Sequence, residues 1–159
     1  MTPEKYMKEA LKQAKLAVKH GEVPVGAVIV YQDKIIARGY NKRKMKQQTV
    51  EHAEMDAIRK ACRVIGSWRL EDCDMYVTLE PCPMCAGAIL QARMRKVYYG
   101  ADDPKAGVLG SLFNMYEFPG FNHYPEVEKG ILYEECSTIL KEFFKNLRAR
   151  NTKERADEV

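Results

Sequence analysis

The sequence predicts an α/β fold, because segments with helical periodicity alternate with short runs of β-branched and aromatic residues. The chain has 159 residues, of which 46% are hydrophobic and 30% are charged. This length and composition are ordinary for one globular domain that builds its own core. We therefore expect a single domain over residues 1–150, followed by a charged and frayed tail at residues 151–159.

The first half of the chain predicts a helix, a hairpin and a second helix. Residues 4–20 carry apolar side chains at helical spacing, and Gly21 ends this helix. Residues 23–31 and 34–40 read as two strands joined by a tight turn. A polar loop at residues 42–48 follows, and a helix over residues 52–65 comes next.

The second half predicts further alternation around one long loop. The apolar run at residues 75–79 is typical of a buried strand, which Pro81 ends because proline cannot donate a ladder hydrogen bond. We expect a helix over residues 83–93 and a strand at 96–99. The loop-rich stretch at residues 101–126 contains five aromatic residues, which argues against disorder and favours a functional loop with one helical turn near residues 112–116. A strand near 127–131 and a helix over 133–148 complete the expected elements.

A pair of cysteines marks the predicted start of the helix at residues 83–93. Cys82 and Cys85 lie three residues apart, and residues at this spacing share one face of a helix. The free N–H groups of a helix start favour negative charge, which helps to hold both cysteines as thiolates. Two thiolates make half of a zinc site, and His52, thirty residues upstream, can supply a third ligand. Three protein ligands leave a position for water, which is the pattern of catalytic zinc.

Glu54 follows His52 closely and gives the motif its catalytic character. A carboxylate beside a metal can move protons without binding the metal, so Glu54 is the candidate general acid and base. The order His-x-Glu, then Pro-Cys-x-x-Cys, is the established signature of zinc-dependent nucleobase deaminases. The motif therefore predicts hydrolytic deamination.

The cysteine pair has two other possible interpretations, a redox motif and a structural zinc site. The segment from Cys82 to Cys85 also fits the redox motif of glutaredoxin-like proteins, although that interpretation leaves His52 and Glu54 without a role. A structural zinc site would need a second cysteine pair, and the remaining cysteines form none. Those cysteines, expected to be buried free thiols, are Cys62, Cys73 and Cys136.

Charge and cysteine usage limit the partners and the compartment. The net charge of +4 permits an RNA partner without requiring one. No apolar run approaches the roughly 18 residues of a membrane span, and the N-terminus lacks the apolar core of a signal peptide, so we expect no membrane partner. The odd count of five cysteines indicates no disulfide framework, which favours a reducing cytoplasm.

Beyond the zinc motif, the chain resembles the bacterial tRNA-specific adenosine deaminases of the cytidine deaminase-like superfamily, from about Tyr6 to Arg148. The zinc motif alone indicates only the superfamily, whereas the segment from Gly100 to His123 and the C-terminal helix point to the tRNA branch. The matching segments are Gly21–Ala27, Asn41, His52–Glu54, Val77–Ala88, Gly110–Leu112, Phe121–His123, Gly130–Leu132 and Phe143–Phe144.

The resemblance implies a three-layer α/β/α fold with a mixed five-stranded sheet, and a homodimer. It implies hydrolysis of the wobble adenosine in a tRNA anticodon loop to inosine, with release of ammonia. By this resemblance Zn²⁺ is held by His52, Cys82 and Cys85, and Glu54 shuttles protons. Asn41 would hydrogen-bond the flipped base and Leu79 would wall its pocket. The residues implied to contact the RNA loop are Asp103, Lys105, Asn122 and His123.

Two residues depart from the family pattern. Glu51 stands before the metal-binding histidine where a small residue is usual, and Asp56 stands where an apolar or small residue is common. Both would add negative charge near the approach of RNA phosphates.

A deaminase of a free base or nucleoside uses the same chemistry and is the first alternative function. A glutaredoxin-like thiol oxidoreductase is the alternative from another class.

Overall fold

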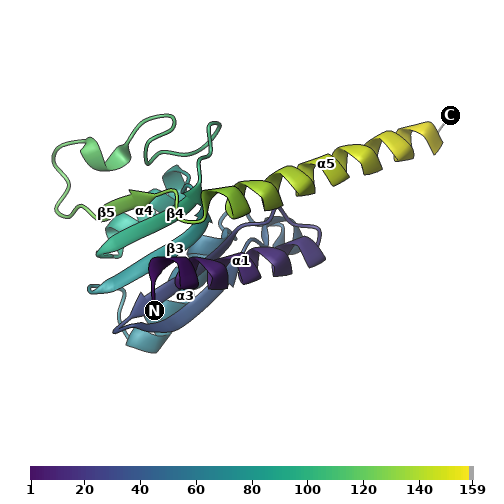
Figure 1. Cartoon of the computed structure of the whole chain (residues 1–159). Helices are drawn as coiled ribbons and strands as arrows, with labels where there is room; N and C mark the ends of the chain where they lie inside the picture. The colour runs from purple at the N-terminus through teal and green to yellow at the C-terminus, as the bar shows by residue number, and fades with distance from the viewer. Residues whose placement is uncertain (158–159) are drawn as a thin grey trace.

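A five-stranded sheet forms the centre of the structure, a computed structural model that describes residues 1–157 (Figure 1). The strand order is β2-β1-β3-β4-β5. β1 pairs antiparallel with β2 and β3, whereas β3, β4 and β5 run parallel, so the sheet is mixed as expected. The strands are β1 (Gly26–Tyr31), β2 (Lys34–Tyr40), β3 (Cys73–Leu79), β4 (Lys96–Ala101) and β5 (Glu126–Lys129).

Helices cover both faces of the sheet, which confirms the three-layer architecture. The covering helices are α1 (Pro3–Lys19), α3 (Ala53–Ile65), α4 (Pro83–Gln91) and α5 (Tyr133–Asp157), while α2 (Arg43–Lys46) is a short turn with no buried residue. Successive side chains of a strand point to opposite faces. Val28 and Val30 of β1 therefore join the core beneath α1 and α5, whereas Ala27 and Ile29 join the larger core beneath α3 and α4.

The strand directions bring three loops to one edge of the sheet. β2 and β3 are both antiparallel to β1, so they run in the same direction as each other and as β4. Their carboxyl ends therefore lie along one edge, where α/β proteins bind their ligands. Asn41 follows β2, Glu80 follows β3 and Asp102 follows β4, so the three loops beyond these residues meet there.

Two elements in the first half of the chain differ from the sequence-based expectation. The first strand begins at Gly26 rather than at residue 23, because Val25 N–H donates to the carbonyl of Val23 (2.9 Å) in a tight turn. The polar segment expected to be a loop contains α2, a single helical turn. The carboxylate of Glu22 accepts from the backbone N–H groups of Lys44 (3.1 Å) and Met45 (2.6 Å) and thereby holds this turn.

Two elements beyond β4 also differ from expectation. The helical turn in the long loop is a 3₁₀ turn at Met115–Glu117, slightly later than predicted. α5 continues to Asp157, past the expected end near Arg148. Residues 151–157 are exposed, so their helix rests on local pairs such as Arg150 and Glu154 (3.9 Å). Fraying of this tail stays a prediction, and its residues 158–159 lie outside the described part. No helix within residues 1–157 is both long and apolar enough to cross a membrane.

The close approach of α1 to β1 generates a stability prediction. A methyl group at Gly26 would meet the α1 backbone at Ala10 and Ala14 and would lie 2.8 Å from Gln13 Cβ. We expect Gly26→Ala to lower the free energy of unfolding by about 1–3 kcal/mol in urea denaturation, the usual cost of overpacking.

Gly87→Ala is the matched control. Gly87 lies inside α4 with open space around the position of a Cβ, so alanine should raise stability by up to about 1 kcal/mol through helix propensity. Wild-type stability of Gly26→Ala would show that α1 does not approach the sheet this closely.

Candidate active site

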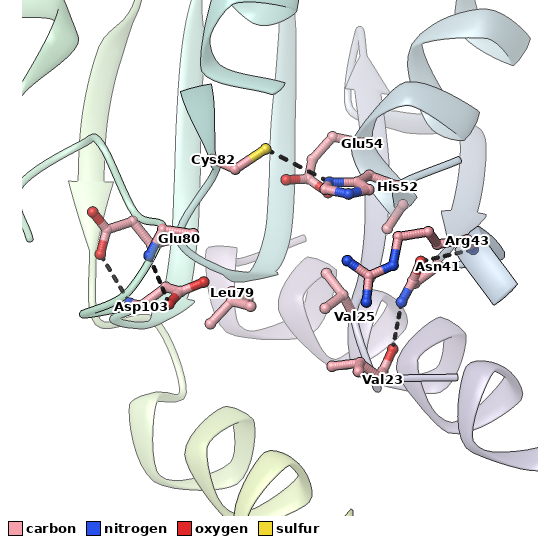
Figure 2. A pocket seen from close by; sticks show the side chains of 12 residues that line it. Val23, Val25, Asn41, Arg43, His52, Glu54, Leu79, Glu80, Cys82 and Asp103 are labelled. Atoms are coloured by element: carbon pink, nitrogen blue, oxygen red, sulfur yellow. Dashed lines mark hydrogen bonds between the residues drawn. The ribbon is translucent and has the colours of Figure 1, made fainter. Parts of the chain in front are cut away.

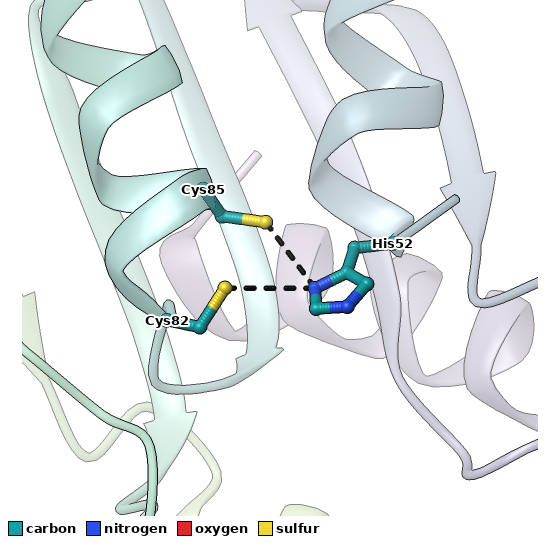
Figure 3. Close-up of side chains that lie close together, drawn as sticks. All are labelled: His52, Cys82 and Cys85. Atoms are coloured by element: carbon teal, nitrogen blue, oxygen red, sulfur yellow. Dashed lines mark hydrogen bonds between the residues drawn. The ribbon is translucent and has the colours of Figure 1, made fainter. Parts of the chain in front are cut away.

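The starts of α3 and α4 bring one histidine and two cysteines together. His52 is the N-cap of α3 and Cys82 is the N-cap of α4, both with extended backbone, and Cys85 lies in the first turn of α4. His52 Nδ1 is 3.6 Å from Cys82 Sγ and 3.5 Å from Cys85 Sγ (Figure 3). One ligand atom from each residue falls within 4.8 Å of the others, so the three side chains could hold a metal ion.

The two thiols of this cluster differ in acidity. A hydrogen bond with Cys85, reinforced by one with His52, lowers the pKa of Cys82 to about 4. The same bond with Cys82, followed by burial, raises the pKa of Cys85 well above its usual value. The pKa of His52 is raised, chiefly by its hydrogen bond with Cys82. Cys82 is therefore a thiolate at neutral pH, whereas Cys85 must lose its proton when a metal binds.

Glu54 lies in the first turn of α3 and points toward the same space as His52 and Cys82 (Figure 2). Residues two apart in a regular helix point about 200° away from each other. Here His52 has extended backbone and lies outside the helix, so its side chain and that of Glu54 converge. Glu54 is only 4% exposed, and burial raises the pKa of its carboxyl to about 7. A carboxyl with this pKa can accept and release protons at neutral pH.

A cavity of about 180 Å³ opens in front of these groups (Figure 2). It is smaller than the roughly 300–1,000 Å³ of pockets that enclose drug-sized ligands, so it suits a group such as one aromatic base. Its walls are Val23, Val25, Asn41, Arg43, His52, Ala53, Glu54, Leu79, Glu80, Cys82, Asp103 and Ala106.

The structure gathers four of the six predicted substrate residues around this cavity. Asn41, Leu79 and Asp103 line it, and Lys105 lies in an adjoining groove of about 550 Å³ that shares Leu79 and Asp103. Asn122 and His123 line a separate hollow with Arg69, Glu71 and Arg93. There His123 Nε2 is 2.7 Å from the carbonyl oxygen of Met94. The four residues predicted to contact RNA therefore lie in two places: Asp103 and Lys105 lie at or beside the cavity, and Asn122 and His123 lie in the separate hollow.

The side chain of Asn41 is held in the wall of the cavity by two hydrogen bonds. Its Nδ2 donates to the carbonyl of Val23 (3.2 Å), and its Oδ1 accepts from the backbone N–H of Arg43 (3.1 Å). A side-chain amide has two N–H donors and an oxygen with two lone pairs. One donor and one acceptor position of the amide therefore remain free, on a side chain whose orientation is fixed.

The sequence motifs missed several residues of the cavity wall. Val23 and Val25 were expected inside a strand, although Pro24 between them was a signal against that assignment. Arg43 lies in the segment expected to be a plain polar loop. Ala106 lies in the segment beyond β4, where a single sequence shows no separate signal.

The two residues that depart from the family pattern are neutralised within the chain. Glu51 and Asp56 are both buried. Arg59 pairs with Glu51 (3.2 Å), while Asp56 accepts from Lys42 (2.8 Å) and Lys60 (3.4 Å). Three cationic side chains accompany the two acids, so the cluster has no excess of negative charge, contrary to the expectation that Glu51 and Asp56 add negative charge here.

Comparison with known proteins places the chain among deaminases. Residues 1–148 match the model of the MafB19-like deaminase family. The guanine deaminase structure of Bacillus subtilis is 35% identical with a TM-score of 0.63, covering 94% of this chain and 95% of that one. A solved tRNA:A34 deaminase, which edits A to I at the wobble position of transfer RNA, has a TM-score of 0.82 at 44% identity, covering 85% and 98%. The tRNA-specific adenosine deaminase of Bacillus subtilis is 52% identical over 147 residues, 92% of this chain and 91% of that protein. The chain therefore belongs to the family of tRNA-specific adenosine deaminases.

Proposed function

We propose that this protein hydrolyses the wobble adenosine of a tRNA anticodon loop to inosine and releases ammonia. The observation that carries the proposal is a base-sized cavity that joins the His52, Cys82 and Cys85 cluster to the buried carboxylate of Glu54, in a chain of this family. An unstacked loop base is the easiest base of a folded RNA to extrude into such a cavity.

The donor set fits Zn²⁺, which we infer to be the metal. Thiolate sulfur at about 2.3 Å and imidazole nitrogen at about 2.0–2.1 Å from zinc, at tetrahedral angles, would lie about 3.6 Å apart. The observed sulfur-to-nitrogen separations are 3.6 and 3.5 Å. When bound, zinc lowers the pKa of water to about 7, so that water becomes a nucleophile at neutral pH.

Glu54 carries the protons in the proposed reaction. Its carboxylate takes a proton from the attacking water and delivers protons to a ring nitrogen and to the departing amine. Water thereby replaces the exocyclic amine, and ammonia leaves. Burial supports this role because the raised pKa, about 7, lets Glu54 work in both directions near neutral pH.

The walls of the cavity orient the base and the RNA beside it. In this proposal Asn41 hydrogen-bonds the base with its free amide positions, and Leu79 packs against the base. Asp103 and Lys105 contact the neighbouring nucleotides. The groove that adjoins the cavity supports this, because its lining includes Phe144 and three cations, Lys105, Lys141 and Arg148, which outnumber the two acids Asp102 and Asp103. Phosphate groups bind such cations, and bases stack on such an aromatic ring.

We also propose a cytoplasmic homodimer, in which Asn122 and His123 contact RNA away from the cavity of their own chain. Exposed apolar side chains support a second copy, among them Trp68 (59% exposed) and Val64. Light scattering that gave the mass of one chain would contradict the dimer. The tRNA pool on which the enzyme would act supports the cytoplasmic location.

A deaminase of free bases is the second candidate, favoured by the likeness to a guanine deaminase structure and by the small cavity. A free base would make no use of the cation-lined groove. The glutaredoxin-like alternative is contradicted by the family to which the chain belongs.

The first prediction concerns the metal. Purified protein should contain about one zinc ion per chain in elemental analysis, because residues 1–157 contain one complete ligand set. Cys85→Ser should lose the zinc. Cys62→Ser, which changes a free cysteine outside the cluster, should retain it. Full zinc content in Cys85→Ser would refute the ligand assignment.

The second prediction concerns proton transfer. Glu54→Gln should keep its zinc and fold but lose about 10²–10⁴-fold in kcat, the usual loss of a general acid and base. Glu51→Gln is the control, because Glu51 is also buried but pairs with Arg59 and does not line the cavity. Near-normal turnover by Glu54→Gln would transfer the role to another residue.

The third prediction concerns the substrate. The wild-type protein should form inosine at the wobble position of an unmodified anticodon stem-loop. Lys105→Ala should weaken stem-loop binding and lower the slope of log affinity against log salt by about 0.7, the value for one phosphate contact in single-stranded RNA. Lys8→Ala, on the exposed face of α1, should leave both unchanged. Salt-insensitive deamination of guanine or adenosine faster than that of the stem-loop would favour the second candidate.

A further inference from the structure

Glu80 is a buried carboxylate for which the proposed chemistry has no use. It follows β3 directly, lies two residues before Cys82 and is only 2% exposed. Its Oε1 accepts from the backbone N–H of Asp103 (3.0 Å) and from the hydroxyl of Ser111. Its Oε2 accepts from the backbone N–H groups of Leu109 and Ser111, both at 3.0 Å. All four donors belong to the segment 103–111, so one side chain holds nine residues of loop.

The segment 103–111 wraps closely around this carboxylate. A Cβ placed on Gly107 would lie 2.5 Å from each oxygen of Glu80, so no other residue fits at that position without displacing the loop. Asp103, held through its N–H, in turn accepts with Oδ1 from the N–H groups of Lys105 (3.1 Å) and Ala106 (3.2 Å). A continuous set of hydrogen bonds thus runs from Glu80 to Lys105, and Figure 2 shows its first contact.

We propose that Glu80 is a positioning residue for the RNA substrate. Its carboxylate fixes the segment 103–111 in one conformation and so presents Asp103, Lys105 and Ala106 to the incoming nucleotides. The inference rests on the proposed function and deepens it by naming what orders the RNA-facing wall. Because each oxygen of Glu80 already accepts two hydrogen bonds, this side chain does not exchange protons with the substrate.

The effect of such an anchor falls on binding rather than on chemistry. A loop that is ordered before binding avoids the conformational entropy loss that a mobile loop suffers when it closes on a ligand. The proposed zinc ligands and Glu54 lie at the starts of α3 and α4, outside the anchored segment. Loss of the anchor should therefore raise KM for RNA and leave kcat nearly unchanged.

The test is Glu80→Gln in the full-length, zinc-loaded protein. An amide nitrogen would face two hydrogen-bond donors in either orientation. If it replaces Oε1, Ser111 can rotate its hydroxyl and accept, but the N–H of Asp103 loses its acceptor. We expect KM for an anticodon stem-loop to rise about tenfold or more, the equivalent of at least one charge-assisted hydrogen bond. Amide hydrogen exchange across residues 103–111 should become faster, while kcat and zinc content stay within about twofold.

Gly107→Ala provides an independent variant, because its methyl group should disturb the loop only while the Glu80 carboxylate is present. Alone, it should raise KM for the stem-loop in the same manner. In a Glu80→Ala background it should add little, so the two changes should be clearly non-additive. Ser111→Ala, which removes one of the four donors and keeps the backbone contacts, should have a smaller effect than Glu80→Gln.

Two results would overturn the inference. One is a large fall in kcat of Glu80→Gln with KM and hydrogen exchange unchanged, which would place Glu80 in the chemistry. The other is unchanged KM in both Glu80→Gln and Gly107→Ala. Each requires an active wild-type enzyme, so both differ from failure of the proposed function, which is the inability of the wild-type protein to deaminate the stem-loop. In that case the substrate role of Glu80 is overturned as well.

Discussion

The common direction of β2, β3 and β4 is the constraint on which the rest of the site depends. It brings three strand ends to one edge of the sheet. The starts of α3 and α4 meet there, with His52 and Cys82 as their N-caps. Helix starts leave backbone N–H groups without partners and favour negative charge, which suits a thiolate pair. The sheet topology thus brings His52, Cys82 and Cys85 together, and the helix starts favour negative charge on the sulfur atoms.

Three of the buried glutamates around this edge, Glu22, Glu54 and Glu80, differ in role because their partners differ. Glu22 accepts from backbone N–H groups of α2, and Glu80 accepts from four donors of the segment 103–111. Each of these carboxylates accepts hydrogen bonds from a loop segment, so each stabilises one wall of the cavity. Glu54 lacks such a set of donors, and burial raises its pKa to about 7. Glu54, whose carboxylate is not hydrogen-bonded to these loops, is the one of the three that is suited to carry protons.

Ion pairing decides what the charges near the site do. From the sequence alone, Glu51 and Asp56 are expected to add negative charge beside the site. In the fold they lie buried against Lys42, Arg59 and Lys60, which neutralise them. The groove beside the cavity is lined by three cations, Lys105, Lys141 and Arg148, and by two acids, Asp102 and Asp103. Which charges near the site are neutralised therefore depends on three-dimensional pairing rather than on the local sequence.

The sequence by itself determined the α/β class, most element positions and the candidate metal ligands. Periodicity, prolines and the cysteine spacing are local features, and local features survive folding unchanged. Only the tertiary structure decided that Asn122 and His123 lie apart from the cavity, and that Val23 and Val25 form its wall. It also decided the anchoring of loops by Glu22 and Glu80, whose hydrogen bonds join residues more than twenty positions apart. Such contacts depend on how strands are ordered in the sheet, which no local pattern encodes.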